Sequence, residues 1–276
     1  MFIEILKTIL LGIVEGITEW LPVSSTGHMI LLNEFLRLDV SDEFWEMFEV
    51  VIQLGAILAV VVLFFSRLNP FAPSKSVAEK RGTWSLWFKI IVAVVPSAVV
   101  GLLLDDWFNE HFYNYVVVAI ALIVYGIAFI LIEKVRKPVA SVADSADKIT
   151  YKEALLIGAF QVLAIIPGTS RSGSTILGAM LFGLSRTAAA EFSFFMAIPT
   201  MAGASLLKIV KFALSGVSVT MNEWIILAVG CLVAFLVSLA AIRYLMDYVK
   251  RHTFSAFGVY RIILGAVVIA YFLIAG

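Results

Sequence analysis

Six long apolar stretches constrain how this chain can fold. Each approaches the roughly 20 helical residues needed to cross the hydrocarbon core of a bilayer, and they lie at residues 48–66, 84–104, 115–133, 190–212, 224–244 and 256–275. Hydrophobic residues make up 62% of the 276 residues and charged residues only 14%. Because one water-soluble core of this size could not bury so much apolar surface, the sequence predicts an all-α integral membrane protein, with one membrane domain over residues 1–276.

Two further apolar segments, 2–38 and 153–184, are broken near their middle. The first is interrupted by Pro22 and the sequence SSTG, and the second by Pro167 and the sequence GTSRSG. Proline and glycine end helices, and non-helical backbone is tolerated at membrane depth only where protein or a water-filled cavity covers it. Both segments are therefore predicted to form re-entrant helix-loop-helix hairpins.

The charges of the loops predict the orientation of the chain. Lysine and arginine gather in the loops after the first and third spans and between the last two spans, whereas the loop at 105–114 is acidic. Basic loops remain in the cytoplasm. The first hairpin should therefore open to the outside and the second to the inside.

Each hairpin is followed by three spans, so the two halves of the chain should have opposite topology. This arrangement predicts an inverted repeat of residues 1–133 and 151–276, with the two loop tips meeting near the membrane midplane. An internal echo supports the repeat. At an offset of 146 residues, Gly12 falls on Gly158, Glu15 on Gln161, Ser24 on Ser170, Thr26 on Ser172 and Gly27 on Gly173.

Two carboxylates precede the first break. Glu15 and Glu19 are four residues apart, so on a helix they share a face. Two charged carboxylates repel in a low dielectric, and a bound divalent cation, a shared proton or a nearby arginine could offset that repulsion. The alternative is a hydrated helix end at which both side chains meet water.

A run of hydroxyl residues and one histidine follows Pro22. Ser25 lies three residues before His28, within reach across one helical turn, and is a candidate nucleophile. The imidazole of His28 can exchange a proton near neutral pH. The alternative for the Ser24 to Thr26 run is capping of the helix that starts after the break, which is compatible with catalysis.

The second break places one arginine among small residues at the start of a new apolar helix. The planar fork of Arg171 suits phosphate oxygens, and a helix N-terminus adds backbone N–H donors. The alternative is an arginine that only anchors the cytoplasmic face. We expect the side chains of Arg171 and His28 to face one small polar cavity.

The sequences EGITEWLPVSSTGH and PGTSRSG, in this order, closely resemble the motifs of the bacterial undecaprenyl-pyrophosphate phosphatase family of the bacitracin-resistance type. The resemblance covers essentially the whole chain. Carried over by motif position, the catalytic residues would be Glu15, Glu19, Ser25, His28 and Arg171. Residues in supporting, substrate-binding positions would be Ser24, Thr26, Gly27, Thr169, Ser170, Ser172 and Gly173.

The resemblance implies an enzyme that hydrolyses undecaprenyl pyrophosphate to undecaprenyl phosphate and inorganic phosphate, recycling the lipid carrier of cell-wall synthesis. It also implies a multi-pass protein of the bacterial cytoplasmic membrane whose site opens to the outer face. A divalent cation, Mg²⁺ or Ca²⁺, would be held by Glu15 and Glu19. Serine, histidine and water all stay open as the nucleophile.

Two other functions fit parts of the pattern. Inverted repeats and broken helices are also typical of transporters, so a polyprenyl-phosphate flippase is the main alternative. A phosphatidic-acid-type phosphatase is less well supported, because no second histidine lies in an intramembrane motif. Nucleic acid is not an expected partner, since 20 basic residues balance 20 acidic ones. The sequence leaves open whether the protein is a monomer or a homodimer.

Overall fold

The computed structural model describes residues 1–135 and 145–275, and this part of the chain is helical without a strand. Six of its helices are long and apolar enough to cross a membrane, which confirms the six predicted spans. They are α3 (Asp42–Leu63), α5 (Val77–Phe112), α6 (Tyr115–Val135), α9 (Arg186–Leu214), α10 (Met221–Arg251) and α11 (Ser255–Ala275). Part of the predicted basic loop after the third span, residues 136–144, lies outside the described residues.

One predicted loop is wrong. The acidic stretch at 105–114 was expected to be a loop, but α5 continues through it and ends at Phe112. Hydropathy marks where the apolar surface of a span ends, and a helix can continue beyond that point into a polar environment. The connection to α6 is therefore short, from Phe112 to Tyr115.

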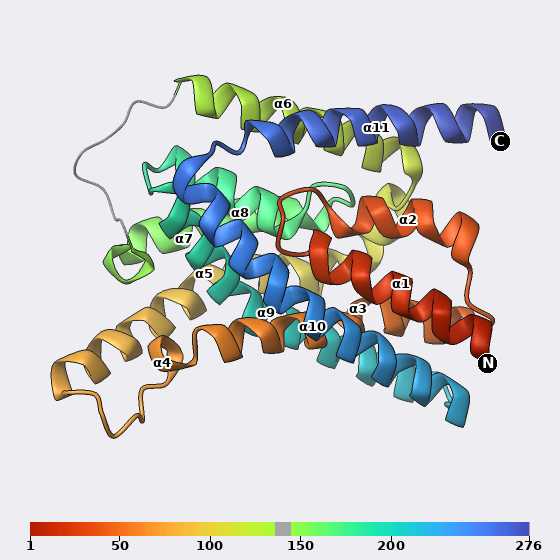
Figure 1. The fold of residues 1–276 in the computed structure, drawn as a ribbon, viewed down its shortest axis with the longest axis horizontal. Helices are drawn as coiled ribbons and strands as arrows, with labels where there is room; N and C mark the ends of the chain where they lie inside the picture. The colour runs from red at the N-terminus through yellow and green to blue at the C-terminus, as the bar shows by residue number, and fades with distance from the viewer. Residues whose placement is uncertain (136–144, 276) are drawn as a thin grey trace.

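The long helices pack closely through glycine. A Cβ on Gly55 of α3 would overlap the carbonyl oxygen of Cys231 on α10, and a Cβ on Gly126 of α6 would lie 2.6 Å from the carbonyl oxygen of Gly258 on α11. Small residues at such contacts let helix backbones approach, which is how membrane helices gain packing energy. In Figure 1, α6 and α11 accordingly run side by side along one edge of the molecule.

Gly55→Ala is expected to destabilise the protein, because the new methyl group would force α3 away from α10. Overpacking of this kind costs about 1–3 kcal/mol, and thermal unfolding in detergent would measure it. Gly82→Ala on α5 is the matched control, since a Cβ there meets nothing within 4 Å. Equal melting temperatures for the two variants would contradict the expectation.

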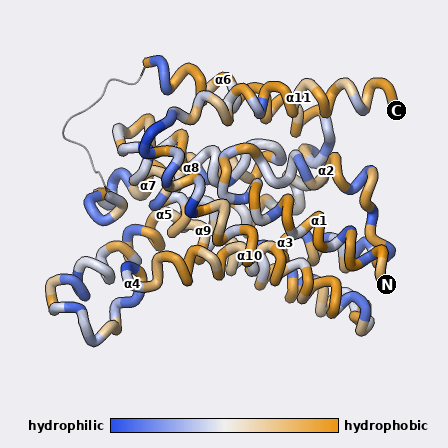
Figure 2. Tube along the Cα trace, viewed as in Figure 1, coloured by the Kyte–Doolittle hydropathy of each residue, from blue (hydrophilic) through white to orange (hydrophobic). Residues whose placement is uncertain are grey.

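Both broken segments form a pair of short helices joined by a loop. The first comprises α1 (Phe2–Thr18) and α2 (Ser25–Leu36). The second comprises α7 (Tyr151–Val162), a 3₁₀ turn η2 (Leu163–Ile165) and α8 (Arg171–Leu181). Figure 2 shows hydrophilic residues gathered in the loops, notably around α4 (Phe65–Leu68) and between α10 and α11, while the long helices are mostly hydrophobic.

The first loop, residues 19–24, and the second loop, residues 166–170, both end in a serine with a positive φ. Ser24 precedes α2 with φ +73°, and Ser170 precedes α8 with φ +72°. Each serine hydroxyl accepts a hydrogen bond from the amide three residues later, Gly27 N at 3.3 Å and Gly173 N at 3.1 Å. A positive φ is uncommon for a residue other than glycine. The two loops therefore lead into α2 and α8 with the same local geometry, a capping serine of positive φ.

Candidate active site

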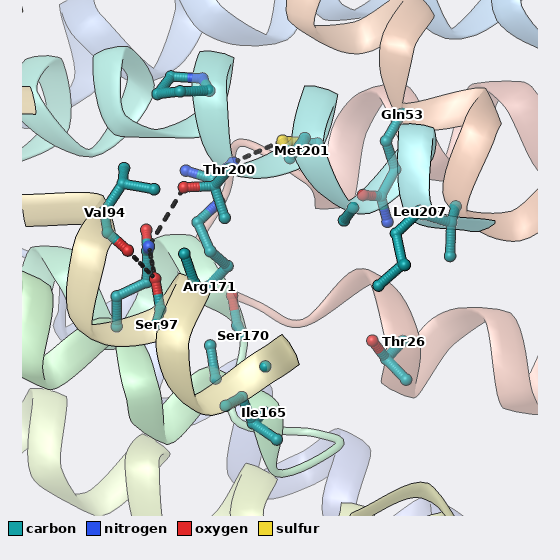
Figure 3. A pocket seen from close by; sticks show the side chains of 18 of the residues that line it. Thr26, Gln53, Val94, Ser97, Ile165, Ser170, Arg171, Thr200, Met201 and Leu207 are labelled. Carbon is teal, nitrogen blue, oxygen red and sulfur yellow. Dashed lines mark hydrogen bonds between the residues drawn. The ribbon is translucent and has the colours of Figure 1, made fainter. Parts of the chain in front are cut away.

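A cavity of about 420 Å³ lies between the two loops and the long helices α3, α5 and α9 (Figure 3). Residues of the two loops and of the helices α2 and α8 form part of its wall. Its polar and charged lining residues are Glu19, Ser25, Thr26, Gln53, Ser97, Gln161, Ser170, Arg171, Thr200 and Lys208. The cavity therefore gathers side chains from sequence positions more than a hundred residues apart.

Three of the predicted catalytic residues form one continuous chain. Arg171 Nη2 donates to Glu19 Oε1 at 2.8 Å, and the Ser25 hydroxyl donates to Glu19 Oε2 at 2.9 Å. Hydrogen bonds between charged groups are among the stronger ones in proteins. Glu19 thus connects the arginine of the second hairpin to the serine of the first.

The guanidinium of Arg171 is held in place by the surrounding helices. Its Nη1 donates to the backbone carbonyl of Ser193 at 2.9 Å, and its Cζ lies 5.6 Å from the ring centre of Trp20. Its Nε has no hydrogen-bond partner among the residues that the structure describes. The group is therefore oriented in advance by its neighbours, and its Nε is a buried donor without a partner in this part of the chain.

Some of the predicted substrate-binding residues line the cavity, and others hold the two loops in place. Thr26 and Ser170 line the cavity. Ser24 is buried and caps α2 through the Gly27 amide, which agrees with the capping interpretation, and Ser170 caps α8 in the same way through the Gly173 amide. The Ser172 hydroxyl donates to the Glu19 carbonyl at 3.0 Å and joins the two hairpins, while Thr169 is a buried residue of the second loop.

The prediction that His28 and Arg171 face one cavity is wrong for this structure. His28 Nδ1 lies 2.7 Å from the Ser24 carbonyl, and Nε2 lies 2.6 Å from the hydroxyl of Tyr260 on α11. The imidazole stacks on the Tyr260 ring, with centroids 5.6 Å apart. Because these contacts turn the ring toward α11, His28 is not among the lining residues, and no hydrogen bond joins it to Ser25 in the described part of the chain.

Glu15 lies one helical turn before Glu19, but it does not line the cavity. Its side chain is buried, with 1% exposure, and its Oε1 has no hydrogen-bond partner among the described residues. No group of three or more His, Cys, Asp or Glu side chains that could hold a metal occurs within those residues. Glu15 is therefore a buried carboxylate with one oxygen left unsatisfied.

Several polar residues of the site were not predicted. Gln161 donates to Ser97 at 2.5 Å and to Thr200 at 3.2 Å, forming a polar cluster in the cavity wall. On α11, Arg261 is completely buried behind the two loops. The signal for Arg261 was available, since it is the one charged residue in the apolar stretch 256–275, and a charge inside a span is a functional candidate by default.

Comparisons with known proteins identify the family of this chain. Residues 8–267 match the family model described as "Bacitracin resistance protein BacA". An undecaprenyl-diphosphatase of Enterococcus faecalis is 59% identical over 273 residues, covering 99% of each chain. Undecaprenyl-diphosphatases of Limosilactobacillus fermentum and Acetivibrio thermocellus are each 58% identical, covering 98% of both chains. The chain therefore belongs to the bacitracin resistance protein BacA family.

Proposed function

We propose that this protein is an undecaprenyl-diphosphatase of the membrane, releasing undecaprenyl phosphate and inorganic phosphate from undecaprenyl pyrophosphate. The relatives that carry this name match it over nearly their whole length. The structural observation that supports the activity best is the Arg171–Glu19–Ser25 chain beside a cavity. The reaction would recycle the lipid carrier for cell-wall synthesis and would oppose bacitracin, as the family's description suggests.

The chain of contacts supports a role for each residue. The Ser25 hydroxyl already donates its hydrogen to Glu19, so Glu19 is placed to accept that proton as Ser25 attacks the terminal phosphorus. The bond from phosphorus to the bridging oxygen then breaks, and undecaprenyl phosphate leaves. Water hydrolyses the phosphoserine, which releases inorganic phosphate and restores the serine hydroxyl, and Glu19 passes the proton that it accepted to solvent. Arg171 stabilises the negative charge of the transferred phosphoryl group throughout.

The buried carboxylate of Glu15 supports a bound divalent cation. Its unpaired oxygen suits a hard cation, and Mg²⁺ is commonly bound by one or two carboxylates together with substrate phosphates and water. Glu15 and Glu19 would hold Mg²⁺ or Ca²⁺ here. When bound, the cation neutralises phosphate charge. Among the chain's own residues, Glu19 would then share its oxygens with Arg171 and Ser25.

The packing of the hairpins supports an inverted repeat with two re-entrant segments. The first helix of each hairpin packs on the middle span of the other half, α1 on α10 and α7 on α5. The matching capped serines before α2 and α8 fit the same relation. We place the protein in the bacterial cytoplasmic membrane, with basic loops inside and the site open to the outer face.

Purified protein in detergent is expected to release phosphate from undecaprenyl pyrophosphate, and a chelator should slow this release strongly. Adding back Mg²⁺ or Ca²⁺ should restore the rate. Time courses of phosphate release, with and without chelator, would measure both effects. Substrate movement across vesicle membranes without phosphate release would instead favour the flippase. Phosphate release that a chelator does not slow would contradict the role of the cation and leave the phosphatase activity standing.

A further inference from the structure

Arg261 joins the backs of the two loops that carry the proposed active site. Its Nη1 donates to the carbonyl of Pro22 at 3.2 Å, and its Nη2 donates to the carbonyls of Gly168 at 2.9 Å and Thr169 at 3.0 Å. Pro22 precedes Ser24 and Ser25, whereas Gly168 and Thr169 precede Ser170 and Arg171. One guanidinium thus binds both chain segments just before their catalytic side chains.

Within residues 1–135 and 145–275, no ion pair accounts for the charge of Arg261. Its side chain has no exposed surface, and every described hydrogen bond that it makes goes to a backbone carbonyl. Arg171, by contrast, is paired with Glu19. A buried charge inside a membrane protein is costly and is retained where it has a function. Here the function would be to donate hydrogen bonds from one guanidinium to backbone carbonyls of both loops.

The fit around Arg261 leaves little room for movement. A Cβ added to Gly173, in the first turn of α8, would lie 3.1 Å from Arg261 Nη1. On another side, the guanidinium lies over the ring of Tyr125, with Cζ 5.6 Å from its centre. A planar guanidinium offers several donors in fixed directions, which a lysine cannot reproduce. The position of each loop is therefore coupled to the position of the other through this side chain.

We propose that Arg261 is a positioning residue that sets the separation of Ser25 and Arg171 by binding the two loops together. It does not line the cavity, so it acts through the loops and not by contact with the substrate. This role rests on the proposed phosphatase function. Removing Arg261 should leave substrate binding largely intact and impair the alignment needed in the transition state.

The test compares Arg261→Met and Arg261→Lys with the wild-type protein, using phosphate release from undecaprenyl pyrophosphate. We expect Arg261→Met to lower kcat by about a hundredfold, the loss that a displacement of about 1 Å can cause, with little change in KM. Arg261→Lys should retain an intermediate kcat, because it keeps charge and donors without the fork. Arg186→Met is the matched control, since Arg186 pairs with Glu133 and does not line the cavity.

Each outcome decides the proposal. A kcat for Arg261→Met close to that of the wild type, a loss confined to KM, or an equal loss in Arg186→Met would overturn it. If Arg261→Met does not fold by thermal unfolding and gel filtration, Arg261→Lys decides, and a wild-type kcat for that variant overturns the role. Failure of the wild-type protein to release phosphate would reject the proposed function and this role with it, whereas an active wild type with equally active variants rejects only the role.

Discussion

Replacing Arg171 with methionine is expected to lower kcat for phosphate release by about a thousandfold or more, the scale on which a phosphate-stabilising arginine contributes to phosphoryl transfer. The guanidinium is fixed by Glu19, Ser193 and the face of Trp20, so a mobile side chain cannot replace it. Phosphate release at saturating substrate would measure the loss. Arg171→Lys should recover part of the rate, because it restores the charge without the paired donors.

Lys208→Met is a suitable control for Arg171. Lys208 also lines the cavity and carries a positive charge, but it pairs with the exposed Glu46 at 3.4 Å. Its loss should be smaller and should appear mainly in KM. Equal losses of kcat in the two variants would mean that the cavity needs positive charge in general and not the guanidinium beside Ser25.

Ser25→Ala is expected to lower kcat by between about a thousandfold and a millionfold, as removal of a nucleophile does in other hydrolases. Substrate labelled in its terminal phosphate, followed by an acid quench, should leave label on the wild-type protein and none on Ser25→Ala. His28→Asn should keep the labelled species, because the imidazole contacts Tyr260 and the Ser24 carbonyl instead of Ser25.

The same experiment separates the three nucleophiles left open by the sequence. Label that persists in Ser25→Ala and disappears in His28→Asn would make histidine the nucleophile. Absence of label from every protein, with substantial activity in Ser25→Ala, would indicate direct attack by water. Either result would remove the proposed step in which Ser25 transfers its proton to Glu19.

Hydropathy predicted the spans because the lipid-facing surface of each one must be apolar along its length. It failed at 105–112, where α5 extends past its apolar part and ring contacts among Trp107, Phe108, His111 and Phe112 accompany the helix. The breaks at Pro22 and Pro167 were visible because proline and glycine change local geometry directly. Both predicted breaks are loops in the structure, between α1 and α2 and between η2 and α8.

The sequence predicted the site residues that lie next to the breaks at Pro22 and Pro167. It did not predict the contacts that α11, far away in the sequence, makes with them. Glu19, Ser25 and Arg171 meet as expected, because both loops end at one cavity. The direction of His28 depends on Tyr260, a residue 232 positions away, which no local pattern reveals. The lone charge of Arg261 in an apolar span is visible in the sequence, but the three carbonyls that it binds are not.

The contact between Glu19 and Arg171 joins the two halves of the chain. The proposed general base, Glu19, and the proposed nucleophile, Ser25, belong to the first half of the chain, and the guanidinium of Arg171 belongs to the second. Under the proposed mechanism neither half of the chain supplies all three groups, so any substitution that shifts one half against the other should impair the reaction even when it leaves every reactive side chain in place.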